Sequence, residues 1–225
     1  MMSRISVPTG SWRETYNLYQ MPLPVLVLLA AMNQSGAALG PTADLGLEPV
    51  ISEAKYCGKA GGEITLYLRF ILHFQNNTQT PIILPMFAVL SGYELFSDEA
   101  ALKLNRSESS VSIRRNLVLD AAKLDSSTPD PKLFRTLQPG DIWSAYESLS
   151  IVLQPAHGDG LSLLGKDRYL RLRMNPWPAE RKTGEKLRTL WQRYGVLRMT
   201  EVPSLPLKLH VEDRPRAGAC PVYVD

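Results

Sequence analysis

Apolar residues occupy every second position in the run EITLYLRFILHF, which covers residues 63–74. Because successive side chains of a strand point to opposite faces, this spacing predicts a strand with one apolar face. The polar cluster 75–80 interrupts the run, and Pro81 opens a second apolar stretch at 82–90. We therefore expect two strands joined by a polar turn, packed against another layer that buries the apolar face.

Shorter stretches of alternating or continuous apolar residues recur along the chain, with turn signals such as Pro139-Gly140-Asp141 between them. They predict further strands at 48–56, 93–96, 110–119, 134–137, 142–153, 169–174, 196–200 and 204–212. The first of these is expected at a sheet edge, and the stretch 98–104 is expected to form a short helix capped by Asp98. The pattern indicates an all-β fold, an immunoglobulin-like β-sandwich of about 7–9 antiparallel strands.

One amphipathic helix is expected near the C-terminal third of the chain, at about 183–194. Leu187, Leu190, Trp191 and Tyr194 follow the spacing i, i+3, i+4 and i+7, which places them on one stripe of a helix. Gly195 stands where helices commonly end. We expect this helix to cap one end or face of the sandwich.

The N-terminal region differs from the remainder of the chain. The uncharged apolar run 23–32 is too short to span a bilayer, which needs about 20 residues. A small-residue stretch with a candidate cleavage site near Ala37 follows it, and Arg4 and Arg13 precede it. This order is typical of a secretory signal peptide. A buried N-terminal segment and an uncleaved membrane anchor are the alternatives, and a start at Met21 would remove both arginines.

Three segments follow from this interpretation: a signal peptide at 1–37, a linker at 38–47 and a single β-sandwich domain at 48–225. The expected location is secreted or periplasmic, with no stable membrane span after cleavage. Hydrophobic residues make up 44% and charged residues 21%, which is ordinary for a globular protein. The net charge of +3 is too balanced to indicate a nucleic-acid partner.

Export changes the interpretation of the two cysteines, Cys57 and Cys220. An even pair in an oxidising compartment is most simply a disulfide, and two buried thiols are the alternative. The chain has no CxxC motif, so cysteine-based metal chemistry is not expected.

Three motifs carry a resemblance to a known family. The frame L-x-L-x-F-x-x-x-F-x-N-x-T-x-x-P-I-x-L runs from Leu66 to Leu84, the segment 137–140 reads Leu-Gln-Pro-Gly, and Gly165 precedes Tyr169 at the start of a strand. About a third of the chain thereby resembles bacterial extracytoplasmic immunoglobulin-like domains and, more distantly, BsuPI-type proteinase inhibitors. The resemblance implies a β-sandwich outside the cytoplasm, and it raises proteinase inhibition as a candidate activity.

Candidate catalytic chemistry is sparse. The three histidines His73, His157 and His210 are scattered, and no metal-ligand spacing such as HExxH connects them. His157 and Asp159 share a glycine-rich loop and form a weak loop candidate for a hydrolytic or metal site. We expect no cofactor, no metal site and no enzymatic activity.

The segment 180–198 is the strongest candidate for a binding surface. It contains six Lys or Arg residues and two Glu residues, a net charge of +4. The candidate surface consists of Trp177, Arg181, Lys182, Arg188 and Arg193. The alternative is that the tryptophans near this helix belong to the core and that the charges form a solvated outer face.

These observations predict an exported, non-enzymatic binding or structural module with a protein or cell-envelope partner. The alternative is a secreted proteinase inhibitor or a small hydrolase with a loop-based site. Two segments, 76–78 and 105–107, also match the glycosylation sequon, which matters only in a host that glycosylates.

Overall fold

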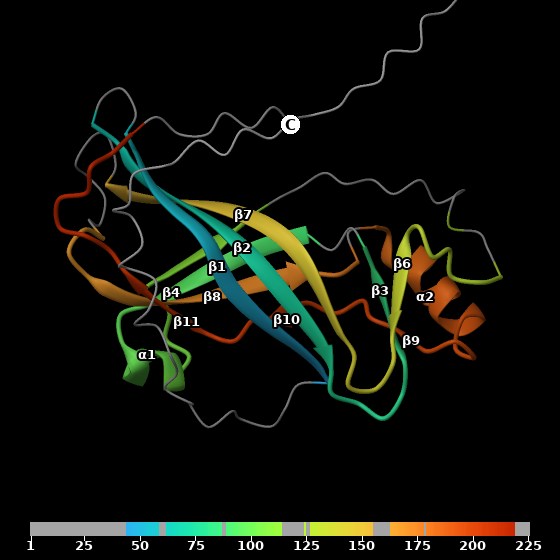
Figure 1. The fold of residues 1–225 in the computed structure, drawn as a ribbon. Coiled ribbons are helices and arrows are strands. Elements are labelled where there is room, and N and C mark those ends of the chain that lie inside the picture. Colours follow the sequence, from blue (N-terminus) through green and yellow to red (C-terminus); the bar gives the residue numbers. More distant parts are fainter. Residues whose placement is uncertain are drawn as a thin grey trace, which may run out of the picture. The chain divides into compact units, whose positions relative to one another are not determined.

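Two sheets face each other in the second of the two units into which the chain divides, Met1–Gly40 and Pro41–Asp225. The structure is a computed structural model that describes residues 44–58, 62–86, 89–113, 124, 127–154, 163–177 and 179–218 (Figure 1). The predicted signal peptide, 1–37, lies outside the described residues. Within these ranges, no helix is long and apolar enough to cross a bilayer.

The first sheet contains β1 (Leu45–Gly58), β2 (Ile64–Asn76) and β7 (Ile142–Gln154) in the order β1-β2-β7, all antiparallel. The predicted alternation in β2 is confirmed from Leu68 onward, because Leu68 and Phe70 are fully buried whereas Arg69 between them is exposed. Before Leu68 both faces of the strand are covered, since Thr65 and Tyr67 are buried as well. The C-terminal boundary predicted for the linker, residue 47, is wrong. There β1 begins at Leu45, whose side chain is fully buried and belongs to the core.

The second sheet has the order β10-β8-β4-β5, and β11 also pairs with β8. Its strands are β4 (Val89–Phe96), β5 (Ser109–Ser112), β8 (Asp167–Asn175), β10 (Val202–Pro203) and β11 (Leu207–His210). Burial alternates along β8, with Leu170, Leu172 and Met174 turned inward, as the sequence predicts. The predicted strand 110–119 is described only as far as Ile113.

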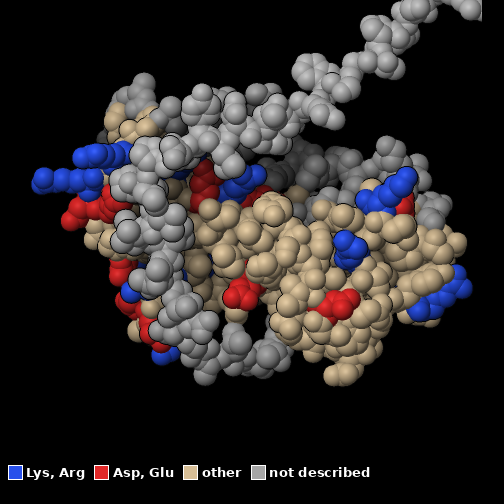
Figure 2. All heavy atoms as spheres, viewed as in Figure 1, with Lys and Arg blue, Asp and Glu red and all other residues tan. Residues whose placement is uncertain are grey.

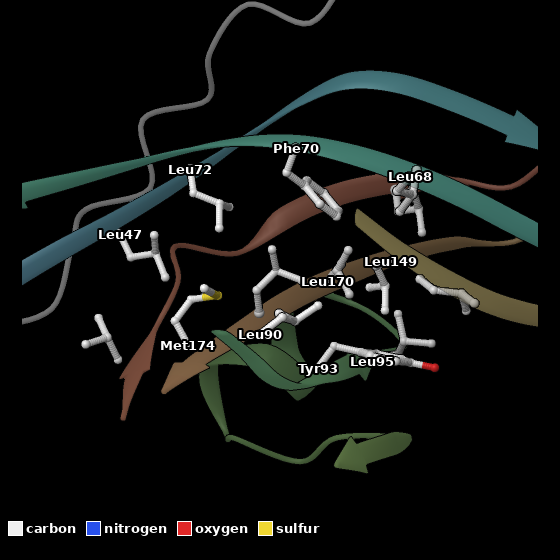
Figure 3. Packing of buried hydrophobic residues seen from close by; sticks show 14 of the residues in the cluster. Leu47, Leu68, Phe70, Leu72, Leu90, Tyr93, Leu95, Leu149, Leu170 and Met174 are labelled. Carbon is white, nitrogen blue, oxygen red and sulfur yellow. The ribbon is translucent and has the colours of Figure 1, made fainter. Parts of the chain in front are cut away.

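A continuous apolar core fills the space between these two sheets (Figure 3). The first sheet supplies Leu68, Phe70 and Leu72 from β2, and the second sheet supplies Leu90 and Leu95 from β4, all at most 2% exposed. The fold is thus an all-β sandwich with a short amphipathic helix, as predicted. The described residues contain eleven strands, more than the expected 7–9.

A third sheet at one end accounts for part of this excess. It consists of β6 (Phe134–Leu137), β3 (Ile82–Pro85) and β9 (Val196–Leu197), with β3 antiparallel to β6 and parallel to β9. The single strand predicted at 82–90 is wrong, because β3 and β4 belong to different sheets. At the end of β3, Pro85 has no backbone N–H for a further ladder bond.

The amphipathic helix α2 (Arg181–Leu190) covers the third sheet and forms a second core with it. It begins two residues earlier and ends four residues earlier than predicted. The chain turns tightly after the helix, since Tyr194 donates its N–H to Trp191 at 2.8 Å. Val196 can then donate to the carbonyl of Pro81 at 2.8 Å, which starts the pairing of β9 with β3.

The short helix α1 (Glu99–Lys103) confirms the expected cap. The carboxylate of Asp98 accepts a hydrogen bond from the N–H of Ala101 at 2.8 Å. This bond, with a second from the hydroxyl of Ser97, lowers the pKa of Asp98 below its ordinary value.

A buried asparagine, Asn76, joins the first sheet to the third. Its Nδ2 donates to the carbonyls of Thr80 and Leu137 at 2.8 and 2.9 Å, and its Oδ1 accepts from the backbone and hydroxyl of Thr78. The side chain is fully buried with every polar atom paired. The sequon at 76–78 therefore has a structural role, and its acceptor nitrogen is closed to modification.

Candidate binding surface

The cationic residues predicted for a binding surface stand together on the outside of α2. Arg181, Lys182 and Arg188 on the helix and Arg193 in the turn after it are all exposed. Glu185 is the only acidic residue within α2. Figure 2 shows Lys and Arg side chains at the end of the unit that carries α2, on the right of the view. We call these four residues the cationic face.

Trp177 does not belong to this face, which corrects the prediction for that residue. It is 5% exposed, and its ring is stacked on Phe134 with centroids 6.5 Å apart. Its Nε1 donates to the carbonyl of Glu180 at 3.1 Å, directly before the helix. Trp191 packs edge-on against Phe134 at 4.7 Å and is likewise buried. The alternative, that the tryptophans near this helix belong to the core, is correct. Trp177 and Trp191 pack beneath α2.

Close packing beneath the helix explains the glycine in its first turn. A Cβ on Gly184 would lie 2.8 Å from the ring of Trp177 and 2.4 Å from the Cε of Met199. Only a residue without a side chain lets α2 approach the tryptophan so closely. The helix is thereby held rigidly with its charged side outward.

The charges of the cationic face are only partly neutralised. Arg181 pairs with Glu185 at 2.8 Å, one helical turn along. The guanidinium of Arg193 lies over the ring of Tyr194, 4.7 Å from its centroid. In the part of the chain that the structure describes, no carboxylate forms an ion pair with Lys182, Arg188 or Arg193. These three cations are available to an anionic partner.

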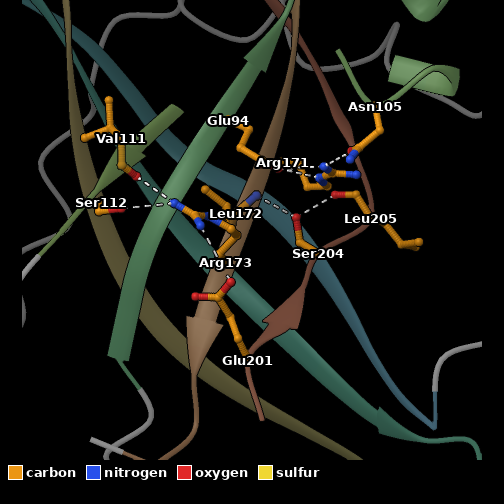
Figure 4. A network of polar contacts seen from close by, with 10 residues as sticks. All are labelled: Glu94, Asn105, Val111, Ser112, Arg171, Leu172, Arg173, Glu201, Ser204 and Leu205. Atoms are coloured by element: carbon orange, nitrogen blue, oxygen red, sulfur yellow. Dashed lines mark hydrogen bonds and ion pairs between the residues drawn. The ribbon is translucent and has the colours of Figure 1, made fainter. Parts of the chain in front are cut away.

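Two arginines of the second sheet, in contrast, are paired with carboxylates of the same chain (Figure 4). Arg171 pairs with Glu94 at 2.6 Å and also donates to Asn105. Its neighbour on β8, Arg173, approaches Glu201 at 3.7 Å and donates to the carbonyl of Val111 at 3.2 Å. Each guanidinium is tied to a carboxylate of the same chain, so this network is structural.

A second glycine makes room for that network. A Cβ on Gly92 would lie 2.3 Å from the carbonyl of Val111 and 2.6 Å from a nitrogen of Arg173. Arg173 therefore lies flat across β4 at Gly92, where any side chain would displace it.

Exposed apolar side chains occur at two places that matter for binding. Leu190, at the end of α2, is 41% exposed. On the outer side of the first sheet, Val50, Ile71 and Tyr146 are cross-strand neighbours in one row, and Tyr146 is 69% exposed. The row is apolar and narrow, and nothing beside it indicates what would cover it.

Sequence reasoning missed two polar contacts of the histidines. The Nδ1 of His73 lies 2.8 Å from the hydroxyl of Ser144, and Glu48 is the neighbour of His73 on the other side. This row of Glu, His and Ser lies on the exposed surface of a sheet, and a triad would need donors for an oxyanion in addition. Only knowledge of the strand register could have brought these residues together.

The other contact joins β11 to β8. The Nδ1 of His210 lies 2.6 Å from Asp167, and the ammonium of Lys208 lies 3.2 Å from the same carboxylate. The hydrogen bond from His210 and then that from Lys208 lower the pKa of Asp167. His73 and His210 belong to different sheets and do not meet. Among the described residues, no group of His, Cys, Asp and Glu could hold a metal ion.

Several predicted site residues are outside the described part of the chain. They are the loop pair His157 and Asp159, and Cys220 of the predicted disulfide. Cys57 is described and fully buried at the end of β1. Next to it, Gly58 donates to Gly218 and Gly218 donates to Tyr56, both at 3.0 Å. Gly218, two positions before Cys220 in the sequence, thus lies beside Cys57.

Comparisons of the chain with protein-family models, with curated proteins and with solved structures find no match.

Proposed function

We propose that this protein is an exported, non-enzymatic binding module that recognises an anionic partner through the cationic face of α2. The observation that carries the proposal is the exposure of Lys182, Arg188 and Arg193 without a carboxylate partner among the described residues. Arg171 and Arg173, in contrast, are paired within the fold. Three such cations within one short helix and the turn after it form a positively charged patch, which favours recognition of a negatively charged surface.

The rigid support of the helix adds to this proposal. Trp177, Trp191 and Leu187 are each at most 5% exposed beneath α2, so the helix does not need to be ordered on binding. Preorganisation of this kind lowers the entropic cost of association. Binding through long Lys and Arg side chains requires no cavity and no catalytic group.

Export is the second part of the proposal, and it rests on the sequence. The apolar run 23–32 precedes the unit Pro41–Asp225, which contains every helix and strand of the described residues. A signal peptide cleaved near Ala37 would leave that unit whole, since it begins at Pro41. Mass spectrometry of the protein recovered from culture medium or periplasm tests this step. We expect a mature N-terminus near residue 38, and an uncleaved chain in the cell would contradict it.

Retention on immobilised heparin, a polyanion, tests the binding role. The variant Lys182→Gln, Arg188→Gln, Arg193→Gln removes three charges from the cationic face. The matched control Lys166→Gln, Arg214→Gln, Arg216→Gln removes three exposed charges near the start of β8 and after β11, away from α2 (Figure 1). We expect the first variant to elute at much lower salt than the control. Equal elution of the two variants would contradict the role of α2.

A specific observation also favours the second candidate, a proteinase inhibitor. The turn between β2 and β3 is exposed at Gln79 and Thr80, and hydrogen bonds of Asn76 and Thr78 hold it in one conformation. Inhibitors of serine proteinases present such a rigid exposed loop. Residual activity of subtilisin with excess protein tests this candidate. Inhibition that is lost on Gln79→Pro would support it, and unchanged subtilisin activity would exclude it for this proteinase.

A further inference from the structure

The outer side of α2 carries a single carboxylate, that of Glu185, next to residues of the cationic face. Residues three and four positions apart are neighbours on the surface of a helix. At these spacings the residues that border Glu185 are Arg181, Lys182, Arg188 and Thr189, which are all exposed. The charge pattern on this side of the helix is therefore one negative group bordered by three positive groups.

Two guanidinium groups of the cationic face are oriented by contacts within the chain. Arg181 pairs with Glu185 at 2.8 Å, although the side chain of Arg181 is 87% exposed. The guanidinium of Arg193 lies over the ring of Tyr194, 4.7 Å from its centroid. A guanidinium has five N–H donors, so each of these groups keeps donors for a further acceptor. The planar fork of arginine matches the two oxygens of a carboxylate.

We infer that the partner of the cationic face is a protein surface on which a Lys or Arg lies among Asp and Glu residues, the inverse of the charges around Glu185. The inference rests on the proposed function and identifies the chemistry of its partner. A folded protein presents both signs of charge at fixed positions, and complementary charges of this kind select one partner against others.

A partner of uniform negative charge, such as an anionic lipid surface or a sulfated polysaccharide, matches this pattern less well. Against such a partner Glu185 would face negative groups, and like charges brought together oppose binding. The helix neighbours of Glu185 are three cations and a threonine, so this side of α2 has no apolar side chain around Glu185 that could enter a bilayer. A protein with a cation opposite Glu185 replaces the repulsion by an attraction.

Crosslinking with a water-soluble carbodiimide tests the inference on the full chain. The reagent joins an amine directly to a carboxylate in contact with it. The protein is treated in an extract that contains the envelope proteins of the producing cells, and the products are mapped by mass spectrometry. We expect Lys182 to be joined to an Asp or Glu of another protein. Arg188→Gln, Arg193→Gln should lower the yield of this product by about ten-fold, and the control Arg214→Gln, Arg216→Gln should not.

The carboxylate on α2 provides the discriminating variant. Glu185→Gln should lower the yield of the Lys182 product by about three-fold, the size expected for one exposed ion pair, and should raise the salt concentration at which the protein leaves heparin. Glu99→Gln is the matched control, because Glu99 also forms an exposed ion pair across one helical turn, with Lys103 on α1 at 2.8 Å. A Lys182 product that is unchanged or increased in Glu185→Gln would overturn the inverse charge pattern.

The outcomes separate this inference from the proposed function. Retention on heparin that depends on α2, without a Lys182 product, would overturn the protein partner and keep the anionic-binding role. Sedimentation with phosphatidylglycerol vesicles that depends on α2, again without the product, would identify a membrane as the partner instead. Retention on heparin that does not depend on α2 would overturn both proposals. We expect the product, with opposite effects of Glu185→Gln on its yield and on heparin retention.

Discussion

The side-chain nitrogen of Asn76 donates a hydrogen bond to the backbone carbonyl of Leu137, 2.9 Å away and 61 residues later in the chain. This bond connects the end of β2 in the first sheet to the end of β6 in the third sheet. The backbone repeats the connection nearby, since Asn76 donates to Asp141 at 3.1 Å and accepts from Gly140 at 2.9 Å. The third sheet, and with it α2, is thus anchored to the sandwich at this corner.

Replacement of this asparagine should be costly. Asn76→Ala leaves the buried carbonyl of Leu137 and the carbonyl of Thr80 without their donor, and we expect a loss of about 2–4 kcal/mol in the free energy of unfolding. Urea denaturation provides the measurement. Gln75→Ala, at the exposed neighbouring position, is the control and should cost less than about 0.5 kcal/mol. Similar losses for both variants would refute the anchoring role.

The glycine in α2 offers a prediction whose sign is decided by packing. By helix propensity alone, Gly184→Ala would stabilise the protein by about 1 kcal/mol. A Cβ would however lie 2.8 Å from Trp177, and overpacking of this kind costs about 1–3 kcal/mol. We expect a net decrease in Tm, measured by thermal unfolding, and a smaller change for Thr183→Ala next to it. An increase in Tm for Gly184→Ala would contradict the close contact.

The carboxylate between β8 and β11 predicts a pH dependence. His210 and Lys208 hold the pKa of Asp167 below its ordinary value of 3.8. Because the folded pKa is depressed, the stabilising contribution is present above the ordinary value and is lost as the pH falls through the folded value. Carboxyl NMR titration should show a rise in the pKa of Asp167 in the variant His210→Ala. An unchanged midpoint would show that His210 makes no such hydrogen bond in solution.

The disulfide between Cys57 and Cys220 stays a prediction, and the position of Gly218 supports it. We expect Cys57 and Cys220 to be bonded in the exported protein, since Gly218 is hydrogen-bonded on both sides of Cys57. The bridge would close a loop for which the chain-entropy model allows at most about 5 kcal/mol. Reducing agent should then lower the Tm of the wild type and leave Cys57→Ser, Cys220→Ser unchanged. Labelling of both thiols in the unreduced, folded protein would exclude the bridge.

Alternation along the chain was sufficient to predict the long strands. In β2 and β8 the residues of one parity, such as Phe70 and Leu172, form the core, and this depends only on the two-residue period of a strand. The change of sheet between Leu84 and Val89 could not be predicted in the same way. Both sides of this change are apolar, and the sheet that a strand joins depends on pairing with distant segments such as 134–137.

The sequence predicts the exposed cations of the candidate surface, but its assignment of Trp177 to that surface is wrong. Lys182, Arg188 and Arg193 could be placed outside because charged side chains are rarely buried without a partner. Trp177 precedes the helix in a proline-rich segment, and no periodicity showed that it stacks on Phe134 beneath α2. Likewise, the contact of His73 with Ser144 depends on the pairing register of β2 with β7, which the pattern of either strand alone does not contain.

The most direct test of the central claim is the salt concentration at which the full chain leaves a heparin column. We compare the wild type with Lys182→Gln, Arg188→Gln, Arg193→Gln and with the control Lys166→Gln, Arg214→Gln, Arg216→Gln, two variants of equal net charge. If α2 carries the binding site, the first variant elutes far below the wild type and the control elutes close to it, because only contacting cations contribute at moderate salt. Elution of both variants at the same salt concentration would show that net charge alone determines binding, and it would contradict the account.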